Sequence, residues 1–291
     1  MVSLRIDYLG SPMLVLGVGV LMLILLEGGV GWPWLSWDSS ALREGKVPEP
    51  IIPLWVFKDR LILFAGLASF LNGAIVIGYS AMVPTHVQGV LGRSVLIAGM
   101  TLAGMSIGWP LASFASGAMM ARMGYRKTAI LGAMIVLLGA SAVLMAAPVS
   151  AFALGFAVFV VGLGLGFQSN AYIITIQSAV EWKQRGVATA NNIFMRTLGS
   201  SVGVAAFGGI LNSTVSGYLQ RAPISVADRS SSLSLVNRLL DPSQSGLLGN
   251  DRVVLIQALS QGMLTVFSFM IVAAMIGIGL AWQLPRQFER R

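Results

Sequence analysis

The stretch GAMMARMGYRK, from Gly117 to Lys127, carries Arg122, Arg126 and Lys127 between two long apolar segments. Apolar segments joined by short cationic connections are typical of membrane proteins, in which Lys and Arg concentrate in cytoplasmic loops. The stretch therefore predicts a hairpin of two membrane-spanning helices whose connecting loop lies in the cytoplasm.

The composition of the whole chain agrees with a membrane location. Of its 291 residues, 56% are hydrophobic and 10% are charged, whereas soluble domains have about 25% charged residues. A soluble fold of this length could not cover its surface with so few charges. The 34 glycines are also typical, because glycine is commoner in membrane helices than in soluble ones. We expect an all-α polytopic protein whose main surroundings are the lipid bilayer.

Seven apolar segments are each near or above the ~20 residues that a helix needs to cross the hydrocarbon core. None of them alternates strictly between apolar and polar residues, which argues against a β-barrel. The segments are 8–27, 61–83, 94–121, 129–147, 150–178, 188–213 and 262–284.

These segments predict how the chain is organised. A first helix and an aromatic belt are expected at 1–37, and a Pro-rich charged linker at 38–60. A bundle of six helices is expected at 61–285, interrupted by a long extracytoplasmic loop at 214–260, and a basic tail at 286–291.

The charges of the connections predict the orientation of the bundle. Lys183 and Arg185 follow the segment 150–178, and arginines also follow the last segment, whereas AAPVS at 146–150 carries no charge. Cationic loops mark the cytoplasmic side, so the C-terminus is expected there. The orientation of segment 8–27 stays open, because Arg5 and Lys58 both look cytoplasmic with one span between them.

Several function classes do not match this composition. The net charge of +8 lies in short clusters between apolar runs, so we expect no nucleic-acid partner. The chain has no Cys and a single His, which excludes thiolate chemistry and leaves few hydrolytic constellations. We therefore expect no enzymatic activity, no cofactor and no metal site.

The stretch that predicts the hairpin also resembles the cytoplasmic loop motif of the major facilitator superfamily, G-x-x-x-D-[RK]-x-G-[RK]-[RK]-[RK]. The resemblance implies a loop that helps to latch one conformation of the transporter. Ala121 stands at the Asp position and Tyr125 at the first basic one, which weakens a charge-based latch and keeps a plain cationic loop as the alternative. The matching residues are Gly117, Arg122, Gly124, Arg126 and Lys127.

A second resemblance covers residues 176–211. It is similar to the penultimate helix of the fourteen-span drug:proton antiporters, with an R-G-x-A-[ST] entry at 185–189, Arg196 two turns later and glycines at the exit. The resemblance implies the C-terminal half of a multidrug efflux permease in the bacterial inner membrane: half of a major-facilitator bundle, with six family helices plus one linker helix at 1–37. It also implies a small amphipathic or cationic substrate, and an N-terminal half or a second copy as partner. The alternative is a truncated, non-transporting fragment or a helix-bundle partner subunit.

Polar residues inside the spans are the candidates for the substrate pathway, because such residues are costly in the membrane without partners. Asn72 and Tyr79 share one helical face, and so do Gln168, Tyr172 and Thr175, with Asn170 and Gln177 on the opposite face. One face is expected to line a cavity while the other bonds neighbouring helices; the alternative is interhelical bonds alone. The pathway candidates are Asn72, Tyr79, Gln168, Tyr172, Thr175 and Arg196.

Three further features bear on mechanism. Arg196 is either part of the pathway or an anchor that reaches the membrane surface. His86 is interpreted as an interfacial polar residue, with proton binding as the alternative, and the six segments from 61 onward contain no Asp or Glu. Small residues at four-residue spacing predict close helix packing, at Gly104, Gly108, Gly199 and Gly203.

Overall fold

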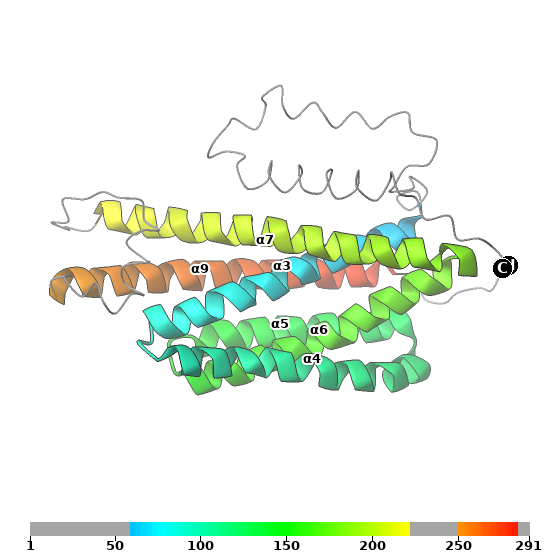
Figure 1. Ribbon diagram of the computed structural model, residues 1–291, viewed down its shortest axis with the longest axis horizontal. Coiled ribbons are helices and arrows are strands. Elements are labelled where there is room, and N and C mark those ends of the chain that lie inside the picture. Colours follow the sequence, from blue (N-terminus) through cyan, green and yellow to red (C-terminus); the bar gives the residue numbers. More distant parts are fainter. Residues whose placement is uncertain (1–58, 222–248, 285–291) are drawn as a thin grey trace, which may run out of the picture. The chain divides into compact units, whose positions relative to one another are not determined.

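The computed structural model describes residues 59–221 and 249–284, and these residues form long helices joined by short connections (Figure 1). The chain divides into two compact units near Arg60, and the helices belong to the second, residues 61–291. The expectation of an all-α fold is confirmed. The helices are α3 (Arg60–Gly89), α4 (Val95–Met123), α5 (Tyr125–Ala146), α6 (Ala151–Ala179), α7 (Arg185–Arg221) and α9 (Gly249–Trp282), with a short 3-10 helix, η2 (Trp182–Gln184), before α7.

All six long helices have the length and apolar composition that a membrane span needs. The shortest, α5, has 22 residues, which at 1.5 Å per residue suffices to cross a hydrocarbon core about 30 Å thick. The described part of the chain is therefore a multi-pass integral membrane bundle, as its composition predicts.

Local sequence signals begin and end several of these helices. The Ser94 hydroxyl accepts a hydrogen bond from the backbone N–H of Ile97 at 3.5 Å and caps α4. The Ser150 hydroxyl accepts one from the N–H of Ala153 at 3.2 Å and caps α6. Serine is favoured at such positions because its oxygen satisfies an otherwise unpaired donor of the first turn.

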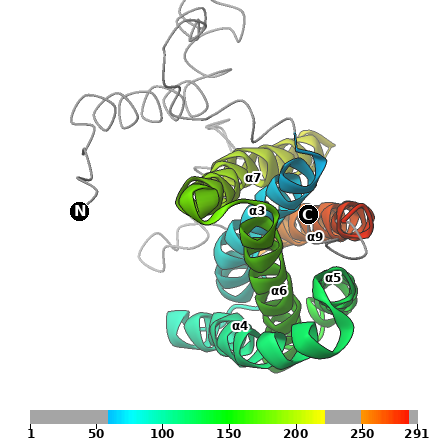
Figure 2. The ribbon, with the colours of Figure 1, turned by 90° about the vertical axis from the view of Figure 1, so that its right-hand side faces the viewer.

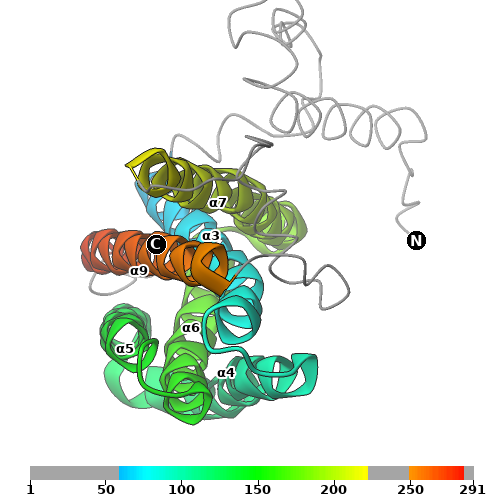
Figure 3. The ribbon, with the colours of Figure 1, turned by 90° about the vertical axis from the view of Figure 1, so that its left-hand side faces the viewer.

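The helices pack as a layered bundle in which α6 lies between α4 and α5, as the two end-on views show (Figures 2 and 3). Helix α9 packs against α5 and α7. Helix α3 lies against α7, because a side chain at Gly73 or Gly199 would overlap the backbone of the other helix. These contacts leave α3 and α6 with the largest buried fraction, 56% of the most apolar stretch in each.

One boundary of the prediction is wrong. The loop expected at 214–260 is helical at both ends, because α7 continues to Arg221 and α9 begins at Gly249. Buried apolar residues extend the helices beyond the predicted spans: Val215 is 1% exposed and Leu255 is 3% exposed. A hydrogen bond of 3.2 Å from the Tyr218 hydroxyl to Gln257 Oε1 joins the two extensions. Among the described residues of this region, Arg221 and Arg252 are exposed on these helices and do not mark a loop.

The remaining predicted parts lie mostly outside the described residues. These are the first span at 8–27 with its aromatic belt, the linker at 38–60 apart from its last two residues, and the tail at 286–291.

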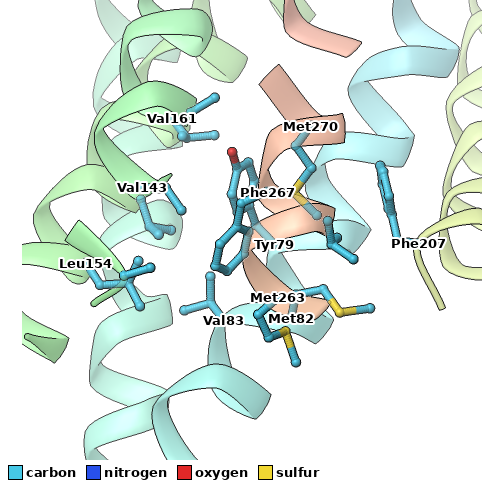
Figure 4. Packing of buried hydrophobic residues seen from close by; sticks show 14 of the residues in the cluster. Tyr79, Met82, Val83, Val143, Leu154, Val161, Phe207, Met263, Phe267 and Met270 are labelled. Atoms are coloured by element: carbon cyan, nitrogen blue, oxygen red, sulfur yellow. The ribbon is translucent and has the colours of Figure 1, made fainter. Parts of the chain in front are cut away.

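Helices α3, α6 and α9 contribute side chains to one apolar core cluster. The rings of Tyr79 and Phe267 stack with their centroids 6.3 Å apart. Leu154 and Val161 of α6 and Met270 of α9 surround this pair (Figure 4). The hydroxyl of Tyr79 is therefore a polar group buried inside an apolar core.

Candidate functional site

One face of α3 presents a polar side chain every seven residues. Asn72, Tyr79 and His86 are 3%, 0% and 1% exposed. An interval of seven is close to two helical turns, so the three side chains form a row about 21 Å long at 1.5 Å per residue. Asn72 Nδ2, Tyr79 OH and His86 Nδ1 have no hydrogen-bond partner among the described residues.

A second row lies on the buried face of α6. Gln168, Tyr172 and Thr175 are 2%, 0% and 2% exposed. Gln168 Oε1, Tyr172 OH and Thr175 Oγ1 likewise have no hydrogen-bond partner among the described residues. Gly132 of α5 makes room for this row, since a Cβ atom there would lie 2.9 Å from Gln168 Cγ.

Helices α3 and α6 contribute side chains to the same two apolar clusters. Tyr172 belongs to a buried cluster with Ala65 and Ala68 of α3, and Tyr79 packs against Val161 of α6 (Figure 4). Buried polar groups in proteins are nearly always hydrogen-bonded, and an apolar interior with a few polar atoms is typical of a small-molecule site. Five of the six pathway candidates are thus buried polar residues of α3 and α6.

The opposite face of α6 holds neighbouring helices. Asn170 Nδ2 donates hydrogen bonds to the Ser113 carbonyl at 3.1 Å and to Ser116 Oγ at 2.7 Å, both on α4. Gln177 Nε2 donates one to Thr189 Oγ1 on α7 at 3.1 Å. The predicted bonding role of this face is confirmed, and α6 separates its polar residues into partnered and unpartnered faces.

The sixth candidate, Arg196, is on α7 and belongs to neither row. Its side chain is half-buried, and a Cβ atom at Gly73 would overlap its carbonyl group. On the same stripe of α7, Asn192 Nδ2 donates a hydrogen bond to Ser69 Oγ on α3 at 2.6 Å. Gly203 lies so close to α3 that a Cβ atom there would be 2.7 Å from Ala74 Cα. The stripe holds α7 against α3.

The predicted packing glycines of α4 lie against α6. A Cβ atom at Gly104 would overlap the carbonyl of Gly155, and one at Gly108 would lie 3.0 Å from the backbone nitrogen of Leu163. Gly162 reciprocates from α6, because its Cβ atom would lie 2.9 Å from Met105 Cα. The two backbones therefore approach as closely as small residues allow.

The loop motif forms a turn of a single residue between α4 and α5. Gly124 adopts φ 82° and ψ 166° and flanks both helices. Its N–H donates a hydrogen bond to the Met120 carbonyl at 2.9 Å, and its carbonyl accepts one from Thr128 Oγ1 at 2.9 Å. A side chain is strained at such angles, so the sharp turn explains a glycine here. Arg122 and Lys127 are exposed and Arg126 is half-buried, while Gly117 is exposed on α4.

Sequence reasoning missed two contributors to the interior. His86 is buried, with its Nε2 2.9 Å from the Ala147 carbonyl, and Phe267 contacts the rings of both Tyr79 and His86. The spacing of seven from Asn72 through Tyr79 to His86 was the available signal for His86. Phe267 had no such signal, because one aromatic residue among many apolar ones does not indicate its neighbours.

Comparison with known proteins identifies relatives of this chain. The family model described as Major Facilitator Superfamily matches residues 3–204. Multidrug transporter protein MdtP of Bacillus subtilis is 26% identical over 268 residues, which are 84% of this chain and 49% of that protein. Multidrug resistance protein 3 of the same species is 28% identical over 233 residues, 75% of this chain and 45% of that protein.

The relatives extend beyond Bacillus. An MFS-type efflux transporter of Aspergillus flavipes is 25% identical over 230 residues, which are 72% of this chain and 40% of that protein. The chain spans about half the length, 49% and 45%, of the first two curated relatives that it matches. With six helices of membrane-spanning length and composition in its described part and a family match over most of its length, the chain belongs to the Major Facilitator Superfamily of membrane transport proteins.

Proposed function

We propose that this chain is the C-terminal half of a proton-coupled exporter of small amphipathic or cationic compounds. The observation that carries the proposal is the pair of buried rows on α3 and α6, whose polar atoms have no hydrogen-bond partner among the described residues. Two relatives named for multidrug transport or resistance support the substrate class.

The chemistry of the two rows suits such substrates. Tyr172 OH, Gln168 Oε1 and Thr175 Oγ1 supply neutral oxygens that accept hydrogen bonds from a cationic or amphipathic compound. Tyr79 and Phe267 supply aromatic faces that attract an organic cation. Neutral acceptors and rings discriminate weakly between shapes, which agrees with a broad range of substrates.

A second bundle is part of the proposal, as an N-terminal half or a second copy of the chain. Its support is the exposed face of α7, which includes the small or weakly polar Ala190, Thr197 and Ala205 beside the larger Ile193 and Val204. The exposed face of α4 carries larger and more exposed side chains, such as Leu96, Ile107 and Phe114. Large apolar side chains suit lipid, whereas small and weakly polar ones suit another helix. Only 17% of the most apolar stretch of α7 is buried, so this helix has the surface to bind a partner.

The orientation completes the proposal. We infer that the turn at Gly124 and the C-terminus lie in the cytoplasm of a bacterial cell, with the chain in the inner membrane. The support is the cationic character of Arg122, Arg126 and Lys127, since such clusters are retained on the cytoplasmic side.

The test is dye accumulation in bacteria that lack their own drug pumps and express the full chain. Cells with the wild-type chain should accumulate less ethidium, an amphipathic cation. Tyr172→Phe removes one buried hydroxyl and should restore part of the accumulation. Tyr125→Phe removes an exposed hydroxyl next to the α4–α5 turn and is the matched control. Equal accumulation with and without the chain, at equal membrane levels and also in cells that supply an N-terminal half, would contradict export.

The alternative is a non-transporting fragment or a partner subunit of another helix bundle. It predicts that the chain reaches the membrane and folds but changes ethidium accumulation in no genetic background, including one that supplies an N-terminal half.

A further inference from the structure

The single histidine of the chain holds one end of the bundle together. His86 lies in the last turn of α3, and its Nε2 is 2.9 Å from the carbonyl oxygen of Ala147, in the turn between α5 and α6. A carbonyl oxygen can only accept, so Nε2 carries the hydrogen in this contact. The other ring nitrogen, Nδ1, then holds a free lone pair and is the basic atom of the neutral imidazole.

The surroundings of Nδ1 are apolar. His86 is 1% exposed, and its ring meets the edge of Phe267 with centroids 5.7 Å apart. The neighbouring buried residues Val83 and Val87 are aliphatic. No hydrogen-bond partner reaches Nδ1 among the described residues.

The charged and titratable groups of the packed elements do not face the imidazole. On α3 the nearest is Tyr79, two turns away, and after α3 comes Arg93, which is exposed. The turn 147–150 carries no charge. On α9, Arg252 is exposed and precedes Phe267 by fifteen residues, about 22 Å along a helix; Asp251 stands beside it in the sequence.

Protonation of this imidazole must therefore be linked to the position of α3. A proton on Nδ1 creates a cation whose second N–H points at apolar side chains, and a buried unpaired charge is expensive. Water can stabilise that cation only if the end of α3 separates from Ala147 and Phe267. Any interaction that stabilises the separated state raises the affinity of His86 for a proton. Proton binding in turn stabilises the separated state by the same free energy.

We propose that His86 is a proton-binding site of the bundle, and that proton binding opens the end where α3 meets the α5–α6 turn. A hydronium ion from the adjoining aqueous phase gives its proton to the Nδ1 lone pair and becomes water, and the reverse step returns a neutral imidazole that closes on Ala147. The inference rests on the proposed transport function. It adds to that function a coupling proton that binds to the His86 imidazole and not to a carboxylate. Residues 61–180, which include α3 through α6, contain no Asp or Glu.

The first experiment reads the ring directly. Because the chain has one histidine, labelling with ¹⁵N-histidine of the untagged full chain in lipid nanodiscs gives the signals of His86 alone. At about pH 8, well above the ordinary titration range of histidine, we expect the tautomer with hydrogen on Nε2. Acidification should convert it to the imidazolium. A neutral form with hydrogen on Nδ1, or a ring that never protonates before the protein unfolds, would overturn the proposal.

The second experiment reads the opening. Ala147→Cys adds a thiol at a position that is 0% exposed, in a chain without other cysteines. Its rate of labelling by a water-soluble maleimide, corrected for the pH dependence of a freely exposed thiol, should rise about tenfold or more on acidification to about pH 5, where histidine is normally charged.

Two variants make this readout specific. His86→Gln keeps an N–H donor for the Ala147 carbonyl but cannot titrate, so it should abolish the rise. Thr85→Val removes a neighbouring hydroxyl that bonds only within α3, to the Ala81 carbonyl, and should preserve the rise. A rise that persists in His86→Gln, or protonation of the ring without a rise, would refute the link. Neither readout requires transport. A chain that gives both expected results but transports nothing would therefore contradict the proposed function and still support the proton site.

Discussion

Gly203 illustrates how single residues set the spacing of the helices. A Cβ atom there would lie 2.7 Å from Ala74 Cα, which is backbone and cannot move aside without shifting α3. Gly209, on the same helix, is exposed and has no atom within 4 Å of the equivalent position.

This contrast predicts a difference between two otherwise identical substitutions. Gly203→Leu should destabilise the bundle by about 1–3 kcal/mol through overpacking, whereas Gly209→Leu should have little effect. Thermal unfolding of the purified variants in detergent measures the difference. Equal stability of the two variants would mean that α7 does not pack on α3 through this stripe.

The two glycines of the loop motif occupy physically different positions, a turn and an exposed site within a helix. Gly124 has φ 82° and ψ 166°, a region that is nearly reserved for glycine and costs other residues about 1–3 kcal/mol. Gly117 lies within α4 and is exposed, and no atom lies within 4 Å of the place that a Cβ atom would occupy there.

Alanine should therefore have opposite effects at these positions. Gly124→Ala should lower the free energy of unfolding by about 1–3 kcal/mol. Gly117→Ala should leave it unchanged or raise it by up to about 1 kcal/mol, because alanine favours helix. Chemical denaturation in detergent compares them. If Gly117→Ala is the more destabilising change, the motif is held by a contact at Gly117 and not by the turn.

At the scale of elements, the sequence predicted which stretches are helical but not where two of them end. Apolar length locates a span because the bilayer demands about 20 apolar residues. Helix α7 continues to Arg221 beyond that requirement, since Leu211 and Val215 pack against α9 at Gly262. That packing depends on a partner helix about fifty residues further along the chain, and no local pattern reports it.

The faces of α6 were predictable for a related reason. Helical spacing separates Gln168, Tyr172 and Thr175 from Asn170 and Gln177 whatever the partner helices are. Which face bonds to neighbours depends on where Ser113, Ser116 and Thr189 lie, and that is a property of the folded bundle. The same limit applies to His86, whose partner Ala147 contributes only a backbone carbonyl.

For the whole molecule, the orientation in the membrane can be tested on a chain that has no natural cysteine. Lys127→Cys, next to the α4–α5 turn, should be shielded from a membrane-impermeant thiol reagent added outside intact cells. Ser231→Cys, in the connection between α7 and α9, should be labelled. The reason is the retention of Arg122, Arg126 and Lys127 in the cytoplasm. The reversed pattern would mean that the bundle has the opposite orientation. Protons would then reach the His86 end from the other side of the membrane.

The proposed function further requires two bundles, because alternating access moves one bundle against another around a site between them. The described helices form one such bundle, and we propose that a second bundle covers the exposed face of α7. Transport should therefore depend on assembly and not on the amount of chain in the membrane.

Proton-driven movement of ethidium across liposomes tests this account most directly. The purified chain is reconstituted with an imposed pH gradient, and the oligomeric state in the same liposomes is determined by cross-linking. The account predicts gradient-dependent dye movement only where two bundles are assembled, from two copies or with an N-terminal half, and none from the monomer. Gradient-dependent movement by a demonstrably monomeric chain would contradict it.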